Sequence, residues 1–322
     1  MNKIKYLASI ATLVLAAQPV LAQQNWPART VRIIVPYAAG GNTDYTARTV
    51  AAKVSEMWGQ QVVVDNRPGG GTNIGSELAA TAAPDGYTLF MGGASNAINM
   101  TLYSKPPYNT ARDFQPVVWC VQGAALLAAH PSLPAKNAKE LIALAKSKPG
   151  QLNYGHAGLG SSNHMAGELL KYLTGINIVH VPYKGNTPSI TDAISGNVEM
   201  VFSGVPALVP HIKSGRLRAI ALSSLERFPA VPDVPTFHES GVKGYEASNW
   251  FGLMAPSKVS KDIVNKINAD ANKALAMKDV REKFDRDGLI TKGGTTEDFG
   301  KFIRAETEKY ANVIKKAGIP QL

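Results

Sequence analysis

The sequence predicts an α/β fold with largely parallel sheets. Short runs rich in β-branched residues alternate with segments of helical periodicity along almost the whole chain of 322 residues. A glycine-rich turn joins a strand-like run to a helical segment once in each half of the chain. Because a crossover helix returns the chain so that the next strand runs parallel to the last, this alternation favours parallel sheets. The length suffices for two medium lobes or one large domain.

The first strand and helix show the pattern most clearly. Residues 31–35, VRIIV, have the β-branched composition of a buried strand. Between residues 44 and 58, apolar side chains such as Ala47, Val50 and Val54 recur at the spacing of one helical face. By the same criteria we expect strands at 62–64, 88–91, 126–129, 152–154, 178–181, 198–202, 217–222 and 251–254. We expect helices at 76–83, 138–146, 163–173 and 187–196, and a mostly helical chain from residue 261 that ends with 297–317.

The N-terminus has the pattern of a secretory signal peptide. Lys3 and Lys5 precede an apolar run at 7–17, and small residues occupy the recognition positions of a cleavage site after Ala22. The run is shorter than the about 20 residues that cross a membrane as a helix, and no later stretch approaches that length. We therefore expect residues 1–22 to be a removed signal peptide and the mature protein to lie outside the cytoplasm.

Charge and cysteine content narrow the class of protein. The chain carries 34 basic and 24 acidic residues, a formal net charge of +10, which attracts anions at long range or simply keeps the protein soluble. The basic residues are scattered and form no stripe interleaved with aromatic residues, so no nucleic-acid partner is expected. The single cysteine, Cys120, lies in an apolar run and is expected to be a buried hydrophobe, so packing alone must hold the fold.

The most informative feature is a pair of similar loops. Residues 36–44 (PYAAGGNTD) and residues 155–163 (GHAGLGSSN) each follow a strand and lead into a helix. Glycines let the backbone approach a ligand, and a helix start offers free N–H groups and the positive end of a dipole. Such a loop can also serve only to make the turn. Because the two loops match in composition and context, we expect them to face each other across a cleft and grip an anionic ligand.

Motifs of the common enzyme classes are absent. Gly160-Ser161-Ser162 lacks the second spaced glycine of a nucleophile elbow, and neither a dinucleotide-binding pattern nor a Walker loop occurs. The six histidines show no spacing of metal ligands, although His156 and His164 flank the second loop. The sequence therefore predicts no enzyme, no cofactor and no metal. A serine hydrolase that uses Ser161 or Ser162 with His164 remains a weak alternative.

Several motifs in order resemble those of one family. The motifs are similar to signatures of the substrate-binding proteins of tripartite tricarboxylate transporters, the Bug family. They are residues 35–44 (VPYAAGGNTD), 66–75 (NRPGGGTNIG), 83–89 (APDGYTL), 158–164 (GLGSSNH), 180–185 (HVPYKG) and 210–215 (PHIKSG). The resemblance runs from about residue 26 to the C-terminus.

The resemblance implies a two-lobed periplasmic binding protein of the Venus flytrap type, type II-like, with a ligand cleft between the lobes. We expect one lobe at 25–123 and 252–322 and the other at 124–251. It also implies a receptor in the periplasm that passes its ligand to membrane permease subunits of a tripartite tricarboxylate transporter. We expect the receptor to be a monomer. In this family, backbone amides of the first loop hold a carboxylate, and the second loop engages the ligand from the other lobe.

These considerations predict a set of ligand-binding residues. Many family members have an acidic residue where Ser203 stands, so this chain is expected to favour a plain dicarboxylate over an amino acid. Tyr37 and the segment 249–251 could form an aromatic wall that suits a flat ligand such as a benzene dicarboxylate. Asp44 is expected to cap or orient its loop, because a bare carboxylate would repel the ligand. The expected site residues are Tyr37, Gly41, Asn42, Thr43, Asp44, Ser95, Asn96, Gly160, Ser161, Ser162, His164, Ser203 and Trp250.

The predicted function is capture of a small carboxylate, expected to be a dicarboxylate and either aliphatic or aromatic, for delivery to a transporter. A receptor that signals through a two-component kinase is an open alternative, because sequence does not separate sensing from transport.

Overall fold

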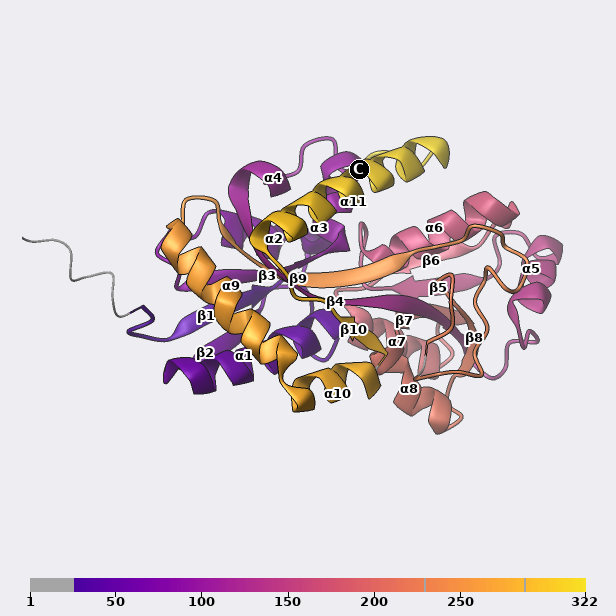
Figure 1. Cartoon of the computed structure of the whole chain (residues 1–322). Coiled ribbons are helices and arrows are strands. Elements are labelled where there is room, and N and C mark those ends of the chain that lie inside the picture. Colours follow the sequence, from indigo (N-terminus) through magenta and orange to yellow (C-terminus); the bar gives the residue numbers. More distant parts are fainter. Residues whose placement is uncertain (1–25, 229, 287) are drawn as a thin grey trace, which may run out of the picture.

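The computed structural model describes residues 26–322 except 229 and 287, and the predicted signal peptide and its cleavage site lie outside the described residues. The molecule has two halves, and two long strands run from one half into the other (Figure 1). The N-terminal elements and the C-terminal helices form one half, and the middle of the chain forms the other.

The first lobe contains a parallel sheet covered by helices. β1 pairs in parallel with both β2 and β3, because the helices α1 and α2 carry the chain back between successive strands. The elements are β1 (Val31–Val35), α1 (Asn42–Trp58), β2 (Val62–Asn66), the 3-10 turn η1 (Gly70–Thr72), α2 (Asn73–Ala80), β3 (Thr88–Gly93), α3 (Ala94–Leu102) and α4 (Thr110–Asp113).

The second lobe repeats this arrangement. β5 pairs in parallel with β6 and β7, and β6 lies at the outer edge of the sheet. The elements are α5 (Ala138–Ser147), β5 (Asn153–His156), α6 (Ser162–Thr174), β6 (Val179–Pro182), α7 (Asn186–Ile194), β7 (Met200–Gly204), α8 (Val205–Lys213) and β8 (Arg218–Leu222).

Two long antiparallel strands join the lobes. In β4 (Phe114–Ala129), residues up to Ala124 pair with β9 (Ser248–Pro256), and residues from Ala125 onward pair with β7 and β8. The chain then returns to the first lobe through α9 (Lys261–Ala276), α10 (Lys278–Arg286), β10 (Leu289–Thr291) and α11 (Thr296–Lys316). We propose that the lobes divide at β4 and β9, as the sequence suggests, because the pairing of β4 changes partners at that point.

Separate hydrophobic cores support this division. One core in each lobe lies between the sheet and its helices, with Val31, Val50 and Ile267 fully buried in the first lobe and Leu141 and Phe202 in the second. Cys120 is buried in the first of these cores, and burial raises the pKa of its thiol to about 12. The predicted hydrophobic role of this cysteine is confirmed.

Each expected strand and helix is present within a few residues of its predicted bounds, except the strand at 126–129, which is the end of the much longer β4. The expectation of largely parallel sheets is wrong in part, because the pairs that β4 and β9 form are antiparallel. Residues 114–125 were not recognised as strand, although β4 begins at Phe114. Among the described residues, no helix combines the length and apolar character needed to cross a membrane.

Candidate functional site

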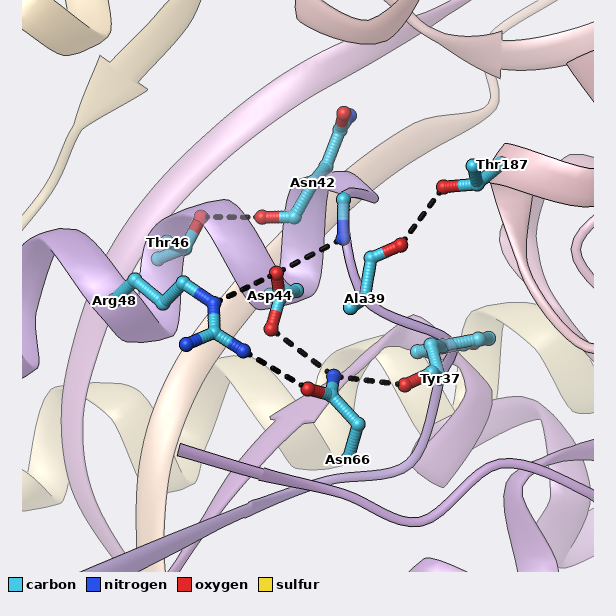
Figure 2. A network of polar contacts seen from close by, with 9 residues as sticks. Tyr37, Ala39, Asn42, Asp44, Thr46, Arg48, Asn66 and Thr187 are labelled. Atoms are coloured by element: carbon cyan, nitrogen blue, oxygen red, sulfur yellow. Dashed lines mark hydrogen bonds and ion pairs between the residues drawn. The ribbon is translucent and has the colours of Figure 1, made fainter. Parts of the chain in front are cut away.

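The first loop connects β1 to α1 and is held by one carboxylate. Gly40 has a φ of +84°, a left-handed conformation that favours glycine. Its N–H donates to Asp44 Oδ2 at 2.9 Å, and Arg48 Nε donates to the same oxygen at 3.0 Å. Asn66 Nδ2 donates to Asp44 Oδ1 and to the Tyr37 carbonyl, each at 3.0 Å, which ties the loop to the end of β2 (Figure 2).

This network keeps Asp44 ionised and away from the cleft. Burial would raise the pKa of the Asp44 carboxyl, but hydrogen bonds from Arg48, Gly40 and Asn66 outweigh burial and lower the pKa. The Arg48 cation offsets the carboxylate charge, so Asp44 does not cancel the positive end of the α1 dipole. The expected orienting role of Asp44 agrees with this geometry.

The N-terminus of α1 is open toward the cleft. Its N-cap residue is Gly41, which offers no side chain to cap the first amides of the helix. Such amides carry the partial positive charge of the helix start and bind anions well.

The second loop connects β5 to α6 and is built differently. Gly158 and Gly160 have φ values of +123° and +73°. Ser161 caps α6, because its Oγ accepts a hydrogen bond from the backbone N–H of His164 at 3.1 Å.

The two loops face each other across one pocket. Polar side chains and backbone from both lobes line it, together with the aromatic rings of Tyr37 and Phe251. The pocket volume is about 20 Å³, room for about one water molecule, so a larger ligand requires the lobes to separate. The lining residues are Tyr37, Gly41, Asn42, Thr43, Ala157, Ser161, Ser162, Asn163, Asn186, Asn249 and Phe251.

Direct contacts between the lobes close the pocket. The Ala38 N–H donates to the Lys184 carbonyl at 3.1 Å. Thr187 Oγ1 donates to the Ala39 carbonyl at 2.8 Å, as Figure 2 shows. A Cβ added to Gly204 in the second lobe would lie 1.5 Å from Asn42 Nδ2 in the first. The structure is therefore a closed state.

A chain of amides crosses the pocket lining. Asn249 Nδ2 donates to Asn163 Oδ1 at 3.3 Å, and Asn163 Nδ2 donates to Asn186 Oδ1 at 2.9 Å. Sequence reasoning did not select these three residues as binding residues, although Asn163 lies in the second loop and 249–251 was singled out. Asn186 follows the HVPYKG motif and begins α7, and this helix start is the signal that could have found it.

The predicted site residues fall into groups. Tyr37, Gly41, Asn42, Thr43, Ser161 and Ser162 line the pocket. Asp44 and Gly160 shape the loops: a Cβ added to Gly160 would lie 2.1 Å from Asn99 Oδ1 of the first lobe. Ser95, Asn96, His164, Ser203 and Trp250 are buried and do not line the pocket.

The expectation that Trp250 lines the cleft is wrong. Neighbouring side chains on β9 point to opposite faces, so Asn249 and Phe251 reach the pocket while the Trp250 indole points away. The indole packs against Phe299 and Phe302, and its Nε1 donates to Glu306 Oε2 at 3.0 Å.

Of the other displaced residues, Asn96 has structural hydrogen bonds, whereas Ser95 and Ser203 are buried without such bonds from their hydroxyls in the part of the chain that the structure describes. Asn96 accepts from the Gly93 N–H at 3.0 Å and donates to Ser76 and Tyr108, so it supports α3 instead of contacting a ligand. Ser95 lies near Tyr37: burial raises the pKa of the Tyr37 hydroxyl, and Ser95 opposes this effect only in part. Ser203 Oγ is buried without a hydrogen-bond partner among the described residues.

The serine hydrolase alternative finds no support in this geometry. Ser161 Oγ accepts from the backbone of His164, and the His164 ring accepts from the Gly160 N–H at 3.4 Å. In the described residues, no hydrogen bond joins either serine of the second loop to a histidine ring that could act as a base.

Comparison with known proteins assigns the family. The family model described as "Tripartite tricarboxylate transporter family receptor" matches residues 46–319. This chain belongs to that family. BugT of Bordetella pertussis is 36% identical over 323 residues, covering 99% of this chain and 99% of that protein. The resemblance seen in the sequence is confirmed, and the family consists of solute-binding receptors, not enzymes.

Solved structures of similar proteins share the fold. A periplasmic binding protein, BugD, matches with a TM-score of 0.89 at 32% identity, covering 92% of this chain and 100% of that one. Rpa4515 of R. palustris with adipate matches with a TM-score of 0.89 at 36% identity, with the same coverage. MatC of Rhodopseudomonas palustris with bound malate matches with a TM-score of 0.86 at 32% identity, covering 89% of this chain and 99% of that one. The two-lobed binding-protein fold is thereby confirmed.

Proposed function

We propose that this receptor is exported to the periplasm, captures a small dicarboxylate between its two loops and delivers it to the permease subunits of a tripartite tricarboxylate transporter. The observation that carries the proposal is the pocket lining, in which hydrogen-bonding groups from both lobes converge and, among the described residues, no Lys, Arg, Asp, Glu or His takes part.

The first loop suits one ligand carboxylate. The uncapped start of α1 supplies backbone amides and a favourable dipole, so no buried cation is needed. The ionised Asp44 behind the loop is paired with Arg48, which limits its repulsion of a ligand anion.

The second lobe suits the other end of the ligand. Ser161, Ser162 and the amides of Asn163 and Asn186 supply polar groups about the opposite wall. The lining offers no carboxylate to receive an ammonium group, which supports a dicarboxylate over an amino acid.

The relatives support an aliphatic chain of modest length. The similar structures hold adipate and malate, which both carry two carboxylates. Tyr37 and Phe251 present aromatic faces that would also contact a benzene dicarboxylate, so both ligand shapes belong in the test.

Calorimetric titration of the mature chain tests the proposal. The panel contains adipate, succinate, malate and terephthalate, with hexanoate as a monocarboxylate control and glutamate as an amino-acid control. Thermal unfolding in the presence of each ligand gives a second readout. At a ligand concentration of about 100 times the dissociation constant, the folded state should gain roughly 2.7 kcal/mol, which is a visible shift in melting temperature. Binding of hexanoate as tight as that of adipate, or binding of glutamate alone, would contradict the two-ended grip.

A deletion strain tests delivery. Loss of dicarboxylate uptake with normal induction of the responding genes supports transport. Normal uptake with lost induction would instead identify the receptor as a sensor.

A further inference from the structure

Three histidines that lie far apart in the sequence meet behind the second loop. One ring nitrogen from each of His156, His164 and His180 lies within 4.8 Å of the others. The ring centroids of the three pairs are 4.8, 5.0 and 5.5 Å apart. None of the three lines the ligand pocket, so the receptor function described above does not use this cluster.

The spacing suits a tetrahedral metal ion. Zinc binds imidazole nitrogen at about 2.0–2.1 Å, so two nitrogens on one tetrahedral ion lie about 3.3 Å apart. His156 Nε2 and His180 Nδ1 are 3.3 Å apart. His164 has to approach by only a small shift, since its ligand atom is already within 4.8 Å of the others.

The loop backbone orients two of the rings. His156 Nδ1 lies 3.0 Å from the Gly158 carbonyl oxygen and 3.2 Å from the Gly158 backbone nitrogen. In the tautomer in which Nδ1 donates to the carbonyl, which is the closer of the two, Nε2 has its lone pair toward His180. A bond of this kind from the second ring nitrogen to a carbonyl is typical of metal-bound histidine. His164 Nδ1 accepts from the Gly160 N–H at 3.4 Å, which leaves Nε2 available.

A carboxylate lies close to the cluster. Glu168, one turn after His164 on α6, accepts from Lys171 Nζ at 2.9 Å and from the Tyr154 hydroxyl at 3.1 Å. Its negative charge favours a cation near the cluster, and the Lys171 ammonium offsets part of that charge.

The cluster is reachable from solvent. His180 lies on β6, the outer strand of the sheet, and is only partly buried. Its neighbour Val179 is 40% exposed. An ion can therefore enter at this edge without passing through the ligand pocket.

We propose that His156, His164 and His180 bind one divalent transition metal, with zinc as the ion that the ligands suit best. Neutral imidazole ligands favour zinc and similar ions over magnesium or calcium, which prefer oxygen. Because His156 and His164 also contact the backbone of the second loop, a bound ion ties this loop to the edge strand.

Zinc titration of the mature chain without a histidine tag tests the proposal, using competition with a chromophoric chelator. We expect one zinc ion per chain. His180→Gln should weaken zinc binding by at least about tenfold, because it removes a ligand that is only partly buried. His238→Gln is the matched control, since His238 is also partly buried in the second lobe and lies outside the cluster.

Cobalt supplies a readout that needs no variant. Cobalt added to the wild-type chain should give the visible absorption of a tetrahedral site, and zinc should displace it. Equal zinc affinity in wild type and His180→Gln, or no stoichiometric zinc binding by the wild-type chain, would overturn the metal site. Dicarboxylate titration does not depend on this result, so failure here leaves the receptor function standing.

Discussion

The first and second loops look alike in sequence and are held in different ways. In the first loop, the Asp44 carboxylate bonds Gly40, Arg48 and Asn66, and the helix start at Gly41 has no side-chain cap. In the second loop, Ser161 caps its helix, and histidine rings lie behind the backbone. In the first loop, the free backbone amides at the start of α1 face the cleft. In the second loop, the Ser161 side chain already accepts a hydrogen bond from the backbone amide of His164.

This difference suggests a division of labour. The uncapped and dipole-assisted start of α1 is the stronger anion site, so we assign it to the ligand carboxylate that contributes most to affinity. The second loop contributes hydroxyl and amide contacts that depend on lobe closure. The following predictions test that division, in order of decreasing effect.

Gly160→Ala should cause the largest loss of ligand affinity. The substitution strains a residue with a φ of +73° and places a Cβ 2.1 Å from Asn99 Oδ1 of the first lobe. The Asn99 amide, which is hydrogen-bonded to Gly71 and Asn73, must move before the lobes come together, so closure is disfavoured. We expect dicarboxylate affinity to fall about 100-fold, equivalent to about 2.7 kcal/mol, in a calorimetric titration. Gly175→Ala is the matched control, because Gly175 has a φ of +68° with nothing within 4 Å of the added Cβ. Equal losses in both variants would show that backbone strain, not closure, is responsible.

Asp44→Ala should have the next largest effect. It leaves the Gly40 N–H without its acceptor and frees Arg48 and Asn66, at a cost of about 2 kcal/mol in the free energy of unfolding. Ligand affinity should fall about tenfold, because the first loop loses its orientation.

Ser161→Ala, which removes only a helix cap, should cost about 1 kcal/mol of unfolding free energy. Chemical denaturation of both variants checks the ranking, and a larger destabilisation by Ser161→Ala would reverse the proposed roles.

The two loops should respond to acid in different pH ranges. The pKa of His164 is lowered from 6.5 to about 4, so the unfolded chain binds more protons than the folded chain between these values. Stability from this group is therefore complete above pH 6.5 and declines as the pH falls toward 4. The lowered pKa of Asp44 means that its contribution is lost only below its ordinary value of 3.8.

Thermal unfolding of the metal-free protein measures this effect. His164→Gln should reduce the fall in melting temperature between pH 6.5 and 4, whereas Asp44→Asn should leave that slope unchanged. Parallel pH profiles for wild type and His164→Gln would contradict the assignment to His164.

Trp250→Phe should leave ligand affinity unchanged. The indole packs on Phe299 and donates to Glu306 Oε2, away from the pocket. The substitution should therefore lower stability only, by about 1 kcal/mol for the lost hydrogen bond, because Glu306 keeps its ion pair with Lys309. Phe251→Ala provides the contrast, because this ring lines the pocket and its loss should weaken binding. A marked loss of affinity in Trp250→Phe would restore the aromatic role first expected for this residue.

The residues predicted for the site line the pocket where their position follows from local sequence. The strand, glycine turn and helix start of each loop lie close together in the chain, so Gly41, Thr43 and Ser161 could be selected from spacing alone. Ser95 and Trp250 were misplaced, because which face of an element meets the cleft depends on packing against distant elements such as α11.

The sequence by itself determined the alternation of strands and helices, the two loops and the family, because each rests on residues that are close neighbours or on motifs in order. Only the tertiary structure decided which strands run antiparallel, how the lobes close through Ala38, Lys184 and Thr187, and that the amides of Asn163, Asn186 and Asn249 form one chain. The physical reason is that these contacts join residues far apart in the chain, and their partners are chosen by the burial of whole sheets and helices, which no local pattern encodes.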